Sequence, residues 1–197
     1  MLHHEFHDVS NTFFHAVRQI LKRDGFRNGD FTRRFFFVVL SARHAAFAFP
    51  LTGTFHGSER TLTIFITIER SGVGSQTGQA RMVAGDNPDA GYLEYMPGGE
   101  SHADAVPVTS IDDYCHGRQL ALGPGDLIKA DAEGADLDVL LGAGEQIRNG
   151  APQLAITTYH VDDHAERMIA WLREIRPDYS LRLKGFSFWT AKPRPVL

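Results

Sequence analysis

In the second half of the chain, strand-like and helix-like runs alternate, and this order constrains the fold more than any other feature. Predicted strands and helices follow one another at residues 126–131, 135–148, 154–159, 162–176 and 181–189. The helical runs carry apolar side chains at the spacing of one helical face. A strand–helix–strand unit brings its second strand back parallel to the first by a right-handed crossover. The order therefore predicts an α/β fold with a mostly parallel sheet and helices on both faces.

The first half of the chain shows a weaker pattern. One helix is predicted over residues 11–23, where apolar side chains recur at helical spacing. Between residues 72 and 100, glycine, aspartate, asparagine and proline favour turns around short strands. The strands predicted in this half lie at residues 35–40, 47–50, 62–68, 81–83 and 92–95.

Composition excludes several classes of protein. The chain has 197 residues, which suits one domain or one domain with an appendage. Its one cysteine, Cys115, excludes a disulfide-stapled scaffold, and a formal net charge of −4 gives no basic surplus for nucleic acid. The longest apolar run, residues 35–40, is far shorter than the roughly 20 residues that span a membrane, and residues 1–7 do not resemble a signal peptide. We expect a soluble, cytoplasmic protein that binds neither nucleic acid nor membrane.

Acidic residues and a histidine follow two of the predicted strands. Asp131 ends one strand and is followed by Glu133, Gly134 and Asp136, and His160 comes after the next strand. Ligands of parallel sheets bind beyond the carboxyl ends of the strands, so Asp131 and His160 are candidate site residues. Gly134 permits a positive φ, and a helix dipole stabilises ionised Glu133 and Asp136. Taken singly, Glu133 and Asp136 are ordinary acidic residues of a helix start.

Three short runs carry a family resemblance. They read VPVTSIDDY at residues 106–114, IKADAEGAD at 128–136 and VLLGA at 139–143. These runs resemble the T-L-D-D, I-K-x-D-x-E-G-x-E and L-x-G-A elements of the FkbM family of methyltransferases, and the resemblance extends over residues 68–190. Asp136 replaces the glutamate that is usual in that family.

The resemblance implies a Rossmann-like class I methyltransferase fold whose N-terminal part is incomplete or divergent. It assigns residues 68–197 to the C-terminal part of the methyltransferase domain and leaves residues 1–67 as a divergent N-terminal segment. Family members place a glycine-rich turn after their first strand, but here the strand at 35–40 runs into Ser-Ala-Arg-His at residues 41–44. Ala48 stands where the family has an acid that holds the ribose hydroxyls.

The implied reaction is transfer of a methyl group from S-adenosylmethionine to a hydroxyl oxygen of a small-molecule acceptor such as a sugar. Asp131 is then expected to bind the methyl donor or to lie near the accepting hydroxyl. Glu133 and His160 are candidate catalytic bases, or alternatively ligands of a divalent metal, although no residue is assigned to a metal outright. Two other functions stay open: an inactive relative that lacks the glycine turn, and a metal-dependent hydrolase that uses Asp131, Glu133 and His160.

Overall fold

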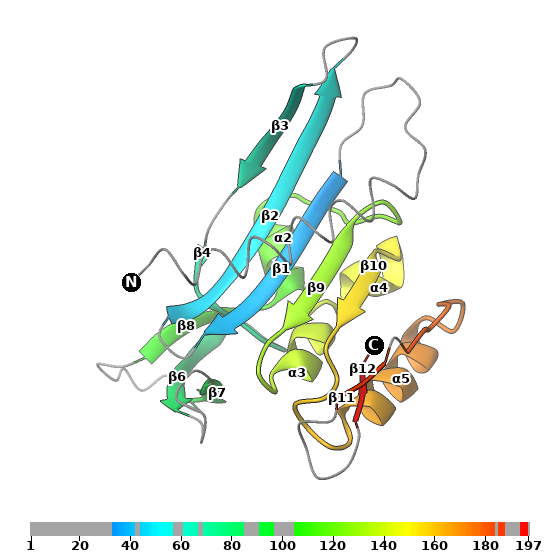
Figure 1. Ribbon diagram of the computed structural model, residues 1–197. Coiled ribbons are helices and arrows are strands. Elements are labelled where there is room, and N and C mark those ends of the chain that lie inside the picture. The colour runs from blue at the N-terminus through cyan, green and yellow to red at the C-terminus, as the bar shows by residue number, and fades with distance from the viewer. Residues whose placement is uncertain are drawn as a thin grey trace.

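The computed structural model describes most of the chain from residue 33 onward. The described residues are 33–41, 44–56, 61–66, 69–84, 91–96, 105–183, 185–187 and 194–196. Within them the strands form one six-stranded, one four-stranded and one two-stranded sheet, with helices from the second half of the chain (Figure 1). The helix predicted over residues 11–23 lies outside the described residues.

The six-stranded sheet is mixed. It contains β1 (Arg33–Ser41), β2 (His44–His56), β3 (Thr61–Ile66), β4 (Glu69–Arg70), β9 (Leu127–Asp131) and β10 (Gln153–Ile156). The strand order is β10-β9-β1-β2-β3, and β4 pairs with β2. β9 is parallel to β1 and β10, whereas β2 is antiparallel to β1, β3 and β4. The strand–helix–strand unit from β9 to β10 is confirmed, but the prediction of a mostly parallel sheet is wrong for its other half.

The antiparallel half begins with a hairpin. Only two residues separate β1 from β2, and Ser41 pairs with His44. A connection this short reverses the chain, because a parallel return needs a crossover of about a dozen residues. The strand predicted at 47–50 is part of the longer β2, which continues through Pro50. Pro50 falls between the β2 residues that pair with β4 and those that pair with β3, so neither strand lies opposite it.

The four-stranded sheet confirms the short strands expected between residues 72 and 100. Its strands are β5 (Gly72–Val73), β6 (Gly78–Ala84), β7 (Gly91–Tyr95) and β8 (Ala105–Thr109). β5 is parallel to β8, and β6 is antiparallel to β7 and β8. Within the strand predicted at 181–189, the described strand is β11 (Gly185–Ser187), which pairs with β12 (Arg194–Val196). Among the described pairings β11 does not join the large sheet, so its predicted place there is wrong.

The single helix predicted over 135–148 is two helices. The described helices are α2 (Ile111–Gly117), α3 (Asp136–Leu141), α4 (Gly144–Gly150) and α5 (His164–Ile175). Tertiary contacts accompany the break at Gly142: its carbonyl accepts the amide of Asp112 at 2.8 Å, and a Cβ there would overlap the carbonyl group of Gly74. A side chain of α2 caps the start of α4. The Asp112 carboxylate accepts hydrogen bonds from the amides of Glu145 and Gln146 at 2.9 and 3.1 Å.

One apolar core joins the helices to the sheet. Ile128 and Ala130 of β9 are fully buried in it, together with side chains from all four described helices. In Figure 1, α2 and α4 lie behind the large sheet. Lys129 and Asp131 alternate with these core residues and therefore lie on the other face of β9. None of the helices in the described part of the chain is long and apolar enough to cross a membrane.

Candidate functional site

The three parallel strands of the large sheet have their carboxyl ends on the same side. β1, β9 and β10 run side by side in the same direction, and Val39 of β1 pairs with Asp131 of β9 (Figure 1). β10 ends at Ile156, and the chain continues to His160. The side chains of His160 and Asp131 approach to 3.8 Å. The structure thus brings together the two strand ends that the sequence singles out.

The turn after β9 has an unusual backbone. Gly134 has a φ of +105°, as expected for a glycine at this place, and Glu133 has a φ of +48°. A positive φ is uncommon for a residue with a side chain, and such residues gather at functional sites. The Asp136 carboxylate closes the turn by accepting the amides of Ala132 at 2.8 Å and Gly134 at 3.2 Å. The turn therefore holds the Glu133 side chain beside the end of β9.

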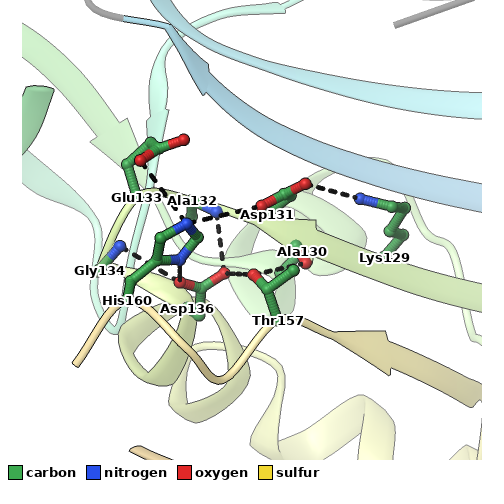
Figure 2. A network of polar contacts seen from close by, with 9 residues as sticks. All are labelled: Lys129, Ala130, Asp131, Ala132, Glu133, Gly134, Asp136, Thr157 and His160. Carbon is green, nitrogen blue, oxygen red and sulfur yellow. Dashed lines mark hydrogen bonds and ion pairs between the residues drawn. The ribbon is translucent and has the colours of Figure 1, made fainter. Parts of the chain in front are cut away.

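Asp136 is the most buried member of the site. Its side chain is 0% exposed, and it accepts hydrogen bonds from the Thr157 hydroxyl at 2.6 Å and from Nδ1 of His160 at 2.8 Å (Figure 2). Burial by itself raises the pKa of Asp136, but hydrogen bonds from His160 and Thr157 outweigh it and hold the pKa below its ordinary 3.8. The sequence indicates only a helix-start residue here, and the missed signal is the nearby His160 on the next strand end.

His160 faces two further carboxylates. Its Nε2 lies 3.5 Å from Oε2 of Glu133 and 3.8 Å from Oδ1 of Asp131, and its side chain is 11% exposed. Burial lowers the pKa of His160, but the three acidic residues Asp136, Glu133 and Asp131 together raise it above 6.5. The ring of Tyr159 lies beside it, with centroids 4.4 Å apart, and burial with the same carboxylates raises the pKa of Tyr159 to about 12.

Asp131 and Glu133 are open to solvent. Their side chains are 34% and 35% exposed. Packing therefore leaves open the acidic corner, the name used here for Asp131, Glu133, Asp136 and His160. Burial raises the pKa of Glu133, as do Asp131 and Asp136, while His160 opposes the shift. Lys129, which the sequence did not single out, places its ammonium 3.4 Å from Oδ2 of Asp131. The corner can therefore attract a cation and exchange a proton with a bound ligand.

The same three predicted residues have the donor set of a metal site. Each of these residues offers one ligand atom, a carboxylate oxygen from Asp131 and Glu133 and a ring nitrogen from His160. The three atoms lie within 4.8 Å of one another. Carboxylate oxygens and an imidazole nitrogen suit divalent cations, and a histidine ligand usually donates its other N–H to a carboxylate, as His160 does to Asp136. This arrangement fits a divalent metal.

Two other polar or nucleophilic residues, Cys115 and His164, are not among the groups that Asp131, Glu133 and His160 contact. Cys115 is fully buried in the core. Helical spacing places His164 on the polar face of its helix and predicts a solvated side chain, but His164 is only 5% exposed. Burial lowers the pKa of His164. The expectation of a solvated side chain is wrong: His164 is the first residue of α5, and its ring lies near enough to Asp136 for that charge to oppose the shift.

The place of the expected glycine-rich turn is taken by the β1–β2 hairpin. With two residues between Ser41 and His44, no helix can follow β1 before the chain returns as β2. Ala48 of β2, expected from the resemblance to replace the ribose acid, pairs with Glu69 of β4. Glu69 in turn forms an ion pair with Arg118.

Comparisons with known proteins agree with the motifs in the second half of the chain. The model of the methyltransferase FkbM domain matches residues 54–181, from within β2 to beyond α5. A solved structure, the methyltransferase FkbM from Methylobacillus flagellatus KT, is 27% identical, with a TM-score of 0.42. The match covers 60% of this chain and 24% of that protein, so this chain spans about a quarter of its length. Among curated proteins no match is found.

The family match includes every residue of the acidic corner. Asp131, Glu133, Asp136 and His160 all lie within residues 54–181, as does the helix break at Gly142. The matched segment makes up more than half of the 197 residues. The chain therefore belongs to the FkbM methyltransferase domain family.

Proposed function

We propose that this protein transfers a methyl group from S-adenosylmethionine to a hydroxyl oxygen of a small metabolite such as a sugar, in the cytoplasm. The observation that carries the proposal is the corner of Asp131, Glu133 and His160 at the carboxyl ends of β9 and β10, within the segment matched by the family. Nucleic acid and membrane surfaces are not part of the proposed interaction, in keeping with the net charge of −4.

Asp131 is the residue that we assign to the methyl donor. S-adenosylmethionine supplies an electrophilic methyl group on a positively charged sulfur. Asp131 and Glu133 are partly exposed carboxylates on an edge where ligands of parallel strands bind, and a cation is favoured beside them. The family's usual glycine turn is replaced by a hairpin, so we assign the nucleoside end to no residue.

Glu133 and His160 are the residues that we assign to the acceptor. A hydroxyl group is a poor nucleophile until its proton is removed, and a positioned base contributes about 10²–10⁴-fold to such a step. Both side chains have a pKa raised above its ordinary value, which moves Glu133 and His160 toward the range useful for a base near neutral pH. Either one can accept the proton of a hydroxyl bound at this corner.

The finer fold assignment is also part of the proposal. The parallel strands β1, β9 and β10 with their crossover helices correspond to the centre of a Rossmann-like sheet, and the β1–β2 hairpin marks its divergent part. We propose that residues 68–197 form the C-terminal part of the methyltransferase domain. The divergent segment, residues 1–67, then supplies β1 to β3 to the same sheet.

Calorimetric titration with S-adenosylmethionine and with S-adenosylhomocysteine tests the proposal. We expect saturable binding of both, weakened in Asp131→Asn and unchanged in Glu145→Gln, a matched exposed acid on α4. Binding weakened equally by both substitutions would contradict the place assigned to the donor. Absence of binding to the unmodified protein would reject the activity itself.

A non-catalytic relative is the second candidate, and the β1–β2 hairpin favours it. A hydrogen bond to a charged group contributes about 1.5–3 kcal/mol, so loss of the ribose acid alone weakens cofactor binding about tenfold or more. An inactive relative predicts no heat of binding with either cofactor form.

A metal-dependent hydrolase is the third candidate, favoured by the ligand atoms of Asp131, Glu133 and His160 within 4.8 Å. Hydrolytic activity that is abolished by a chelator and indifferent to S-adenosylhomocysteine would select this function over methyl transfer. Methyl transfer that survives the chelator would reject it.

A further inference from the structure

We infer that Asp136 is the positioning residue of this site: it fixes the ring of His160 so that Nε2 of His160, rather than the Glu133 carboxylate, is the base. The inference rests on the proposed function and deepens it. It is carried by the position of Asp136 between the turn after β9 and the end of β10. Asp136 itself does not reach the open side of the corner, since its side chain is 0% exposed.

The hydrogen bonds of Asp136 determine which nitrogen of His160 carries a proton. Oδ1 accepts from the Ala132 amide and the Thr157 hydroxyl, and Oδ2 accepts from the Gly134 amide and faces Nδ1 of His160 at 2.8 Å. An ionised carboxylate can only accept, so Nδ1 must be the donor. Neutral His160 therefore carries its hydrogen on Nδ1 and its lone pair on Nε2.

The lone pair points toward the open side of the corner. Nε2 faces Glu133 from the turn at 3.5 Å and Asp131 from the end of β9 at 3.8 Å, and both of these side chains are partly exposed (Figure 2). Once Nε2 accepts a proton, the imidazolium lies among three carboxylates that stabilise its charge. Oε2 of Glu133 lies 3.5 Å from Nε2, where its charge attracts the protonated ring.

The contacts of Asp136 exceed what its position at a helix start requires. Bonds to the Ala132 and Gly134 amides already close the turn before α3. The bonds from Thr157 and His160 come from a different segment, the chain after β10, and tie that segment to the turn. The buried carboxylate thus sets the orientation of a side chain more than twenty residues away in the sequence.

In the proposed step, the acceptor hydroxyl loses its proton as it gains the methyl group. The O–H bond of the acceptor breaks and its proton passes to Nε2 of His160. The oxygen electron pair forms the new bond to the methyl carbon, and the pair of the broken carbon–sulfur bond stays on sulfur as a neutral thioether. Solvent then takes the proton from Nε2, which restores the neutral ring.

The substitution Asp136→Asn tests the orientation directly. The asparagine oxygen at Oδ1 keeps the two shorter bonds, from the Ala132 amide at 2.8 Å and the Thr157 hydroxyl at 2.6 Å. The new amide nitrogen then replaces Oδ2, where it gives up the 3.2 Å bond from the Gly134 amide and faces Nδ1 of His160. That nitrogen is a donor, and it favours the opposite tautomer with the hydrogen on Nε2. Asp138→Asn is the matched control, the same change two residues further along α3.

Nitrogen-15 correlation spectra of histidine-labelled protein, recorded at a pH high enough for the His160 ring to be neutral, report the tautomer. The signal of His160 is identified by its loss in His160→Gln. We expect the Nδ1–H form in the unmodified protein and in Asp138→Asn, and the Nε2–H form in Asp136→Asn. An Nε2–H form in the unmodified protein, or no change in Asp136→Asn, overturns the inference. The spectrum of the unmodified protein is informative even where Asp136→Asn fails to fold.

Methyl transfer to a panel of free hexoses, followed as S-adenosylhomocysteine formed, reports the catalytic consequence. We expect kcat to fall by about 10²–10⁴-fold in Asp136→Asn, with KM for S-adenosylmethionine changed less than about twofold, because the base is lost while Asp131, which we assign to the donor, is unchanged. A larger loss in Glu133→Gln than in His160→Gln overturns the choice of base. Failure of the unmodified protein to bind S-adenosylmethionine rejects the proposed function instead, and the tautomer result distinguishes the two failures.

Discussion

Gly142, the residue after α3, packs directly against the carbonyl group of Gly74. A Cβ at position 142 would overlap the Gly74 oxygen and lie 3.2 Å from Cβ of Ser110. The backbone at Gly142 is ordinary, with a φ of −71°. The requirement for glycine here is therefore one of space and not of backbone conformation.

Gly142→Ala should destabilise the fold by roughly 1–3 kcal/mol, because the new methyl group forces a shift of the Gly74 backbone. Chemical denaturation measures the loss. Gly117→Ala, at the end of α2, has open space around its Cβ and serves as the control. Equal stability of the two variants would show that the loop at Gly74 yields without cost.

Asp112→Ala should cost roughly 1–2 kcal/mol, because the substitution removes the acceptor for two amides at the start of α4. Thermal denaturation checks the effect. Asp163→Ala is a matched control, since Asp163 precedes α5 without a side-chain hydrogen bond to it. A loss in Asp163→Ala as large as that in Asp112→Ala would contradict the capping role.

Thr157→Val should destabilise the corner by roughly 1–3 kcal/mol, because the buried Asp136 carboxylate loses its 2.6 Å hydrogen bond while the shape of the side chain is kept. Denaturation of the variant measures this cost. Thr77→Val, which removes an exposed hydroxyl that bonds Asp113, should cost less. The reverse order would mean that Asp136 finds another donor.

The Asp136–His160 pair should make stability depend on pH in two directions. Asp136 has a pKa below 3.8, so its contribution is present above pH 3.8 and is lost as the pH falls through the folded value. His160 has a pKa above 6.5, so its contribution is full below pH 6.5 and is lost as the pH rises through the folded value.

The stability difference between the unmodified protein and His160→Gln should therefore be greatest between about pH 4 and pH 6.5, with the decline above pH 6.5 due to His160. Denaturant titrations across this range measure the difference. A difference that grows above pH 7 would contradict the pairing.

The sequence predicted the features of the site that depend on local pattern. The ends of apolar strands indicated Asp131 and His160, and a glycine after two acids indicated the positive φ of Gly134. The same reasoning missed the role of Asp136. An acid at a helix start has the same local pattern whether or not a side chain from a distant segment, here His160 after β10, lies beside it.

The fold was less predictable where contacts between distant segments determine the outcome. The break between α3 and α4 depends on Gly74 and Asp112, which are about 68 and 33 residues from their partners in the chain. Helical periodicity continues through both helices and carries no sign of the break. Likewise, apolar residues at 47–50 indicate a strand, but its antiparallel direction follows from the two-residue connection to β1.

The pairing of β1 with β9 has a consequence for how the chain assembles. During synthesis β1, β2 and β3 are complete long before β9, which begins at Leu127, so one edge of this early meander has unpaired backbone groups. A fragment that stops before Leu127 keeps that edge open and is prone to pair with a second copy. Pairing with β9 satisfies these groups, so this edge of the meander is closed in the complete sheet.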